Sequence, residues 1–209
     1  MNEERSTRRA RRPRPDKPSF DLAYYDRFYV DPKTRVADEA QHAKLVQGVV
    51  SMVEYFGVEL ERVLDVGAGV GRWGAWLREN RPSVRVRSTE LDPEVCARFG
   101  HERRDIATWR ARQSFDLVVC QGVLPYLDDD GCARAIENLA AMSRGFLYLE
   151  AITARDLDEV CDRARTDLRV HRRTGAWYRA RLRRHYDEVG AGLFYVKDGE
   201  VAFYELEAR

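Results

Sequence analysis

The sequence predicts a doubly wound α/β fold built on a mostly parallel sheet. Between residues 60 and 150, short apolar runs alternate with segments of helical period, which is typical of parallel strands connected by helices. Residues 115–120 and 145–150 are apolar almost throughout, as expected of strands buried on both faces. Two β-rich runs then flank Asp198 and Gly199, which predicts an antiparallel hairpin at the end of the sheet.

Each element follows from a local pattern. The expected strands are 62–66, 84–90, 115–120, 145–150, 193–196 and 201–206. The expected helices are 38–57, 72–80, 93–99, 128–143, 154–165 and 175–189. Asp38 and Asp92 are suited to cap helix starts, and Gly57 and Gly100 to end helices.

Composition sets further limits. The 209 residues, 44% of them hydrophobic, suit one domain, which we place at 19–209. Apolar runs stay far below the roughly 18 residues of a membrane-spanning helix. The four cysteines contain no C-x-x-C pair, so we expect reduced thiols, no metal site and a cytoplasmic protein.

The net charge of +1 conceals two basic blocks. Residues 1–18 carry seven basic and three acidic side chains and three prolines, which predicts a disordered basic tail. Residues 162–185 carry nine arginines against two aspartates. Solvated surfaces are the simpler interpretation of both blocks, and an anionic partner or substrate is the alternative.

The stretch VLDVGAGVG places Asp65 before a glycine turn between a strand and a helix. Glycines there permit positive φ and let a ligand approach the backbone. Counting from Gly67, the sixth residue is Arg72, so the G-x-G-x-x-G dinucleotide pattern is absent. A carboxylate at Asp65 would repel a pyrophosphate and attract a cationic nucleoside.

Glu90 ends the second expected strand, 19 residues beyond Gly71. A carboxylate at this spacing can accept hydrogen bonds from ribose hydroxyls. Asp92 is the competing residue, but it precedes Pro93 and is better suited to a helix cap.

The successive segments VLDVGAGVG, STELDPE, RRDIAT and FDLVVCQGVLPYL resemble the motifs of class I S-adenosylmethionine-dependent methyltransferases. The resemblance implies a Rossmann-like seven-stranded sheet with a reversed last strand, and S-adenosylmethionine as cofactor, leaving S-adenosylhomocysteine. It implies that Gly67, Ala68 and Gly69 lie against the methionine portion, with Asp65 near its ammonium. It also implies a set of nucleoside and methyl contacts: Glu90 for the ribose, Leu91, Asp105 and Ile106 for the adenine, and Gln121 near the methionine or methyl group.

Acceptor binding is assigned to two flanking segments. An N-terminal lid and helix, 19–57, can close over the cofactor and brings two cofactor-binding candidates, Tyr25 and Arg35, of which Arg35 can pair with the cofactor carboxylate. The helical insertion 151–190 brings His171, the candidate general base, because imidazole titrates near neutrality. Tyr126 and Tyr178 can shape or hydrogen-bond the acceptor.

We therefore expect a methyltransferase acting on a small molecule, anionic if the arginine block binds it. Methylation of RNA or protein is the first alternative. The tetrad Asn/Asp-Pro-Pro-aromatic is absent after residue 120, which argues against methylation of exocyclic amines in DNA but not against every nucleic acid. The second alternative is a cofactor-binding accessory subunit without catalysis of its own.

Overall fold

The computed structural model describes residues 19–209. The basic tail expected at 1–18 lies outside the described residues. Within them, no helix is both long and apolar enough to cross a membrane. The four cysteines are free thiols, as the sequence predicts.

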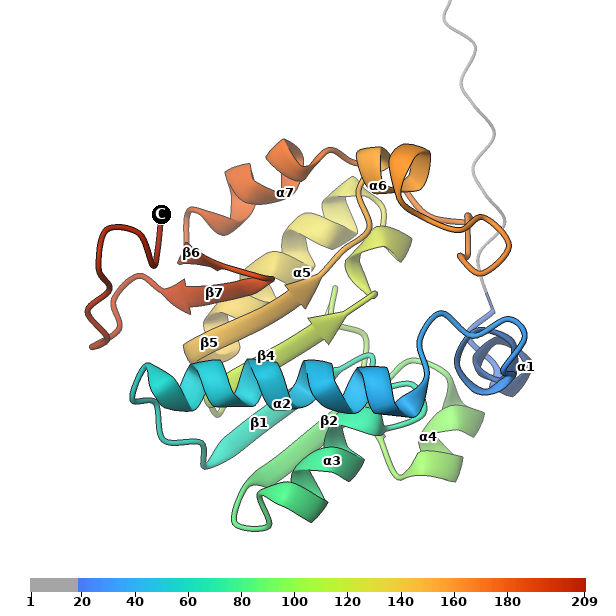
Figure 1. Ribbon diagram of the computed structural model, residues 1–209, viewed down its shortest axis with the longest axis horizontal. Coiled ribbons are helices and arrows are strands. Elements are labelled where there is room, and N and C mark those ends of the chain that lie inside the picture. The colour runs from blue at the N-terminus through green and yellow to red at the C-terminus, as the bar shows by residue number, and fades with distance from the viewer. Residues whose placement is uncertain (1–18) are drawn as a thin grey trace, which may run out of the picture.

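A seven-stranded sheet forms the centre of the molecule (Figure 1). Its strands follow the order β3-β2-β1-β4-β5-β7-β6. The parallel strands are β1 (Arg62–Val66), β2 (Arg85–Glu90), β3 (Glu102–Arg103), β4 (Phe115–Gln121) and β5 (Ser143–Glu150). The antiparallel strands are β6 (Tyr186–Gly190) and β7 (Leu193–Val196). This arrangement confirms the predicted fold class.

Helices cover both faces of the sheet. One face packs against α2 (Glu39–Tyr55) and α3 (Arg72–Asn80), through Val50, Leu77 and the β4 residue Val119. The opposite face packs against α5 (Asp129–Met142) and α7 (Gly175–Leu182), and Val118 of β4 points into this core. Alternate residues of β4 thus enter opposite cores, which explains why the strand is apolar throughout.

Local capping fixes the helix boundaries. The Asp38 carboxylate and the Gln41 side chain form a capping box at the start of α2. Asp92 accepts from the N–H groups of Glu94 and Val95 at the start of α4 (Pro93–Phe99), which confirms its predicted structural role. Gly100 ends α4 in the left-handed conformation.

An aromatic N-terminal segment packs beside α4 (Figure 1). It forms α1 (Leu22–Tyr25) and a π-helical turn, η1 (Asp26–Val30). Tyr24, Tyr25 and Phe28 form a buried cluster with Val95 of α4. This cluster brings the segment to the edge of the sheet where the parallel strands end.

The predicted C-terminal hairpin is wrong in position. The hairpin strands are β6 and β7, joined by a tight turn in which Gly190, Ala191 and Gly192 all have positive φ. The expected helix 175–189 therefore ends at Leu182, and the expected helix 154–165 is only α6 (Ala154–Glu159). The spacing of apolar residues predicted a helix that was too long, because the residues of β6 before the turn also fit a helical spacing.

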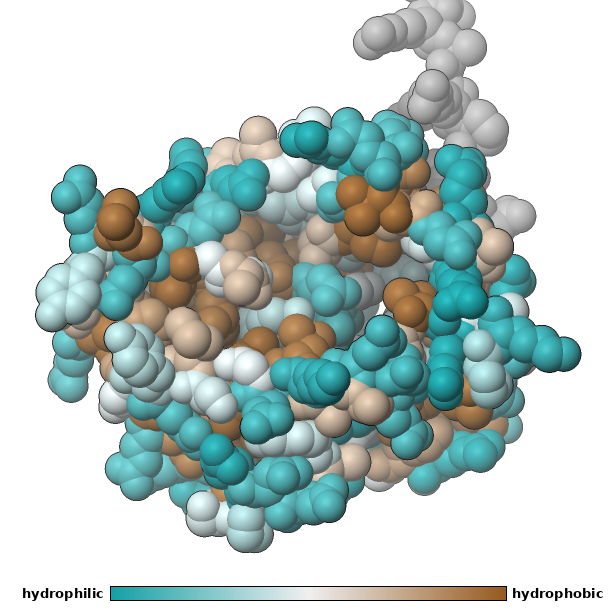
Figure 2. All heavy atoms as spheres, in the orientation of Figure 1, coloured by the Kyte–Doolittle hydropathy of each residue, from teal (hydrophilic) through white to brown (hydrophobic). Residues whose placement is uncertain are grey.

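The expected strand 201–206 is also wrong. Val201 and Phe203 pack against the sheet, but Tyr204 and Leu206 are 82% and 99% exposed. Figure 2 shows hydrophobic side chains on this side, between α2 and the C-terminal segment. At residue 209 the chain pairs with Glu188 through two backbone hydrogen bonds, so it runs beside the outer strand β6.

The arginines of block 162–185 mostly have partners within the protein. Five make ion pairs: Arg165, Arg169, Arg172, Arg173 and Arg179. Arg173 is buried and donates to Asp129 and to the carbonyls of Leu124 and Leu127. The guanidinium of Arg181 stacks on Trp177. Four of these ion pairs lie within the insertion, and Arg173 joins the insertion to α5 and to the segment after β4.

We predict that Gly145→Ala destabilises the protein by roughly 1–3 kcal/mol, the usual cost of overpacking a core. A Cβ at Gly145 would lie 2.5 Å from the Asp116 carbonyl oxygen, so β4 and β5 would have to separate. Gly48→Ala in α2 is the matched control, because nothing lies within 4 Å of its Cβ position. It should raise stability by roughly 0.5–1 kcal/mol. Urea unfolding measures both, and equal effects of the two variants would contradict the prediction.

Candidate active site at the carboxyl ends of the strands

Four neighbouring strands end along one edge of the sheet, with polar side chains at or near their carboxyl ends. In sheet order, Glu90 ends β2, Asp65 lies one residue before the end of β1, Gln121 ends β4 and Glu150 ends β5. The order of connection reverses between β1 and β4, because the chain first builds outwards to β3 and then returns. Ligands of open α/β sheets bind at such a switch point.

The glycine loop follows β1 and leads into α3. Gly67, Gly69 and Gly71 all have positive φ, which glycine adopts without strain. The N–H groups of Gly67 and Ala68 both donate to the Thr89 carbonyl oxygen at 2.9 Å, so the loop is fastened to β2. The loop therefore has a fixed shape before any ligand arrives.

Two side chains come close to the glycines. A Cβ at Gly69 would lie 2.6 Å from the Tyr25 ring, and a Cβ at Gly67 would collide with Val123. The sequence correctly indicated a turn with positive φ at these glycines. Tyr25 and Val123 come from segments far from the loop, which the motif did not reveal.

Asp65 is the least satisfied polar group of the site. Its side chain is 2% exposed, and Oδ2 is buried without a hydrogen-bond partner among residues 19–209. Burial, reinforced by the nearby charge of Glu90, raises the pKa of Asp65 to about 7. A buried carboxylate with an unused oxygen is suited to a cationic ligand group.

Glu90 is 4% exposed, yet both of its oxygens have partners. Oε2 accepts from the Gly69 N–H at 3.0 Å and from the Tyr25 hydroxyl at 2.9 Å. Oε1 accepts from the Leu91 N–H at 2.6 Å. The carboxylate thus joins β2, the glycine loop and the N-terminal segment. Burial and the charge of Glu90 raise the pKa of Tyr25, so its hydroxyl stays protonated as the donor.

His101 supports the same loop and was missed from the sequence. Its Nδ1 contacts the Ser88 hydroxyl at 2.8 Å, and its Nε2 lies 3.0 Å from the Gly69 carbonyl oxygen. The ring also lies against the Cβ position of Gly71. A histidine directly after the helix-ending Gly100 gives no sequence signal of this contact.

The residues expected around an adenine lie at the outer end of the site. Leu91 is half exposed, and the Arg104 N–H donates to the Glu90 carbonyl, which brings Asp105 beside the end of β2. Asp105 Oδ1 accepts from the Ala107 N–H and so shapes the turn. Ile106 is buried, and its carbonyl accepts from Asn138.

A second polar cluster surrounds Gln121, on the other side of the switch point. The Trp73 Nε1–H donates to Gln121 Oε1 at 2.9 Å, and His42 Nε2 lies 3.3 Å from the same oxygen. Gln121 Nε2 donates to Glu150 Oε2 at 3.2 Å. His42, Trp73 and Glu150 were not singled out from the sequence. Glu150 alone had a usable signal, because it ends an expected strand beside Gln121.

The structure brings some acceptor-side candidates near this edge. The Tyr126 hydroxyl lies 2.7 Å from the hydroxyl of Tyr24 in the aromatic N-terminal segment. His171 lies beside it, because its N–H donates to the Pro125 carbonyl. Arg35 makes no side-chain hydrogen bond or ion pair within the described chain. Its guanidinium lies near that of Arg72, which donates to the carbonyls of Tyr29 and Ala37.

Tyr178 lies elsewhere. It is 4% exposed in the core beneath α5 and α7, and its hydroxyl accepts from the buried Arg173. Its environment is that of a packed core side chain. The structure does not bring it to the glycine loop or to Gln121.

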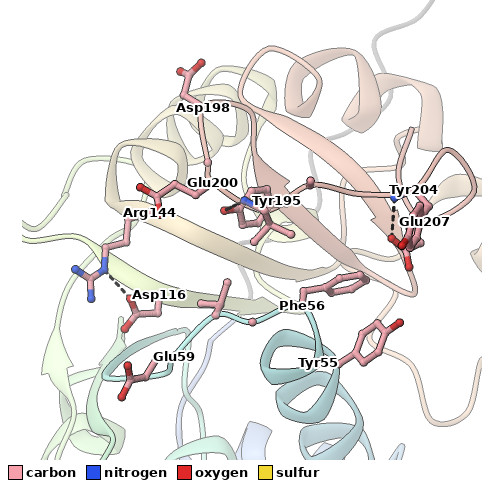
Figure 3. A pocket seen from close by; sticks show the side chains of 15 residues that line it. Tyr55, Phe56, Glu59, Asp116, Arg144, Tyr195, Asp198, Glu200, Tyr204 and Glu207 are labelled. Atoms are coloured by element: carbon pink, nitrogen blue, oxygen red, sulfur yellow. Dashed lines mark hydrogen bonds and ion pairs between the residues drawn. The ribbon is translucent and has the colours of Figure 1, made fainter.

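A hollow with a volume of about 840 Å³ lies at the opposite edge of the sheet (Figure 3). Asp116 at the start of β4 and Arg144 at the start of β5 lie on its wall and form an ion pair. Tyr55, Tyr204 and Glu207 also line it. It is far along the strands from the glycine loop, so its size does not identify it as the functional site.

The residues present fit S-adenosylmethionine. The unpartnered Asp65 oxygen suits an ammonium. The glycine loop has no side chains of its own, so a ligand that displaced the Tyr25 ring from Gly69 would contact its main-chain atoms. Glu90 can accept from ribose hydroxyls, with Leu91 exposed beside it for an apolar ring. For a metal the donor set does not fit, since the described residues contain no group of three or more suitable ligands.

Comparisons with known proteins agree with this geometry. A family model described as "Methyltransferase domain" matches residues 22–191. No curated protein sequence is significantly similar to the chain.

Several solved structures share the fold. An S-adenosylmethionine-dependent methyltransferase from Clostridium acetobutylicum is 13% identical with a TM-score of 0.60, covering 85% of this chain and 97% of its own. Magnesium protoporphyrin IX methyltransferase from Synechocystis, with bound S-adenosylmethionine, is 16% identical with a TM-score of 0.59, covering 84% and 90%. An amino pentose methyltransferase from Micromonospora echinaspora is 17% identical with a TM-score of 0.56, covering 78% and 92%.

The family model spans most of the chain, and the solved methyltransferase structures share its fold. The chain belongs to the methyltransferase domain family and is a class I S-adenosylmethionine-dependent methyltransferase.

Proposed function

We propose that the protein transfers the methyl group of S-adenosylmethionine to a small molecule bound at the carboxyl ends of β4 and β5. The observation that carries the proposal is the buried, unpartnered Oδ2 of Asp65 beside a preformed glycine loop. The small-molecule class draws support from the structural neighbours, which are named as methyltransferases of a magnesium porphyrin and of an amino pentose.

Each residue of the loop edge has a separate task in this proposal. Asp65 pairs with the ammonium, Gly67 to Gly69 contact the methionine portion, and Glu90 accepts from the ribose. Leu91, Asp105 and Ile106 surround the adenine. When bound, the cofactor supplies a methyl group on a positively charged sulfur. The protein's task is then to align the acceptor with that carbon and to exclude water, and alignment can contribute roughly 7–11 kcal/mol.

An RNA substrate has little support from the second basic block. Most arginines between residues 162 and 185 already pair with acids or stack on Trp177. A nucleic-acid surface needs cations that are free to contact phosphates. The same pairing weakens the case for an anionic small molecule.

We predict that Glu90→Gln weakens S-adenosylmethionine binding roughly tenfold to a hundredfold, because charge-assisted hydrogen bonds contribute about 1.5–3 kcal/mol. Asp92→Ala is the control, since Asp92 caps α4 and should cost about 1 kcal/mol of stability without changing affinity. Titration calorimetry measures the dissociation constants. Equal affinity of the Glu90→Gln variant and the unaltered protein would reject the assignment of the ribose site.

Asp65 makes the stability of the cofactor-free protein depend on pH. Its folded pKa is raised from 3.8 to about 7, so the protonated form is favoured by folding. This contribution is fully present below pH 4 and is lost as the pH rises to about 7. Asp65→Asn should therefore exceed the unaltered protein in stability by a margin that grows over this window to about 4 kcal/mol. Unfolding measured at pH 4.5 and pH 8 checks it, and a constant margin would contradict it.

The same group should control cofactor affinity. If the ammonium requires ionised Asp65, affinity should fall about tenfold between pH 8 and pH 6, in proportion to the ionised fraction. Asp65→Asn should bind more weakly at both pH values and lose most of this dependence. Calorimetry at the two pH values provides the comparison, and a pH-independent affinity of the unaltered protein would count against the ammonium assignment.

A further inference from the structure

Glu150 lies at the acceptor side of the switch point with a well-defined orientation. Its Oε2 accepts from Gln121 Nε2 at 3.2 Å and from the Tyr148 hydroxyl at 3.3 Å. Its side chain remains exposed, and Oε1 receives no hydrogen bond from the described residues. One carboxylate oxygen is thus fixed by the protein, while the other is left for a ligand.

The cluster beneath Glu150 explains this orientation. An indole N–H is only a donor, so the Gln121 atom that faces Trp73 must be the amide oxygen. His42 Nε2 approaches the same oxygen and donates to it. With its oxygen held from two sides, Gln121 presents its NH₂ group to Glu150.

No ion pair neutralises Glu150. Among residues 19–209 it forms no ion pair with lysine, arginine or histidine. Burial lowers the pKa of His42, the nearest basic group of the cluster, so that its imidazole is neutral at pH 7. Glu90 and Asp65 add further acidic groups along the same edge. Arg72 lies near His42 and Tyr29, but it forms no ion pair with Glu150, so Glu150 is an unpaired carboxylate at the acceptor side.

Glu150 also lies on the correct side of the cofactor site. Its partner in register is Gln121, the residue after Cys120, and Cys120 pairs with Val66 at the start of the glycine loop. The Tyr29 side chain also reaches the end of β4, because its hydroxyl oxygen lies 4.0 Å from the Cβ position of Gly122. The ends of β4 and β5 lie side by side in Figure 1.

We propose that Glu150 binds the amino group of the methyl acceptor, so that the substrate is an amine and the reaction is N-methylation. This inference rests on the proposed function and specifies its substrate class. The nitrogen lone pair attacks the methyl carbon, and an N–C bond forms as the C–S bond breaks with its electron pair going to sulfur. The positive charge moves to nitrogen beside Glu150, which stabilises it there. A proton then leaves the methylated nitrogen for solvent.

The alternatives fit this environment less well. A carboxylate or phosphate acceptor would meet the unbalanced charge of Glu150 and be repelled. A hydroxyl acceptor would gain a hydrogen bond but no charge pairing. An ammonium gains both when it binds, and it releases one proton to solvent before its lone pair attacks the methyl carbon.

Three probes of matched shape test the proposal: cyclohexylamine, cyclohexanol and cyclohexanecarboxylate. Each is titrated into the complex of the protein with S-adenosylhomocysteine and followed by NMR chemical shifts, without turnover. We expect cyclohexylamine to bind at least tenfold more tightly than cyclohexanol, with cyclohexanecarboxylate weakest. Equal binding of the amine and the alcohol, or tighter binding of the carboxylate, overturns the proposal.

Variants test whether the preference for the amine depends on Glu150. Glu150→Gln should reduce the preference for the amine to less than about twofold and leave S-adenosylhomocysteine affinity unchanged, whereas Glu150→Asp should retain the preference. Glu137→Gln, on α5, is the control and should change nothing. A preference that survives in Glu150→Gln overturns the proposal. If S-adenosylhomocysteine fails to bind the unaltered protein, the proposed function fails, and this inference fails with it.

Discussion

The site depends on the burial of two carboxylates at the ends of adjacent strands. Asp65 and Glu90 lie in an interior where charge is costly, and they differ in their hydrogen-bond partners. Glu90 is stabilised by donors from three segments, whereas Asp65 keeps an oxygen without a partner. The raised pKa of Asp65 reflects its burial and the nearby charge of Glu90, and a cationic ligand would stabilise the ionised form. The surrounding apolar strands supply the stability that holds an unfavourable group in place.

The charges along this edge and those on the surface have separate roles. The acids at the ends of β2, β1 and β5 lie along the line where cofactor and acceptor would meet. Most arginines of residues 162–185 instead have partners within the protein: Arg169 and Arg172 pair with acids of the insertion, and Arg173 pairs with Asp129 of α5. A count of charges along the sequence therefore suggests an anionic partner, whereas their pairing in space suggests a cationic one.

The sequence was sufficient for four of the five parallel strands and for the glycine turn after β1, but it gave no signal for the two-residue strand β3. These four strands and the turn depend on short segments, such as VLDVGAGVG, in which neighbouring residues act together. It was insufficient where side chains converge from distant segments. His42, Trp73 and Glu150 lie on α2, α3 and β5, and their meeting at Gln121 is a property of packing. The hairpin was misplaced because Asp198 and Gly199 form an ordinary turn, while the strand reversal uses Gly190 to Gly192.

The strand order has a consequence for how the chain folds during synthesis. β7 lies between β5 and β6, although it is made after both. Until residues 193–196 leave the ribosome, β5 has an open edge bearing Phe146, Leu147 and Tyr148, and β6 has no neighbour. Unpaired apolar edges of this kind invite aggregation. Residues 193–196 thus complete the sheet after every other strand has been made, and the nascent protein must keep this edge from other chains until they emerge.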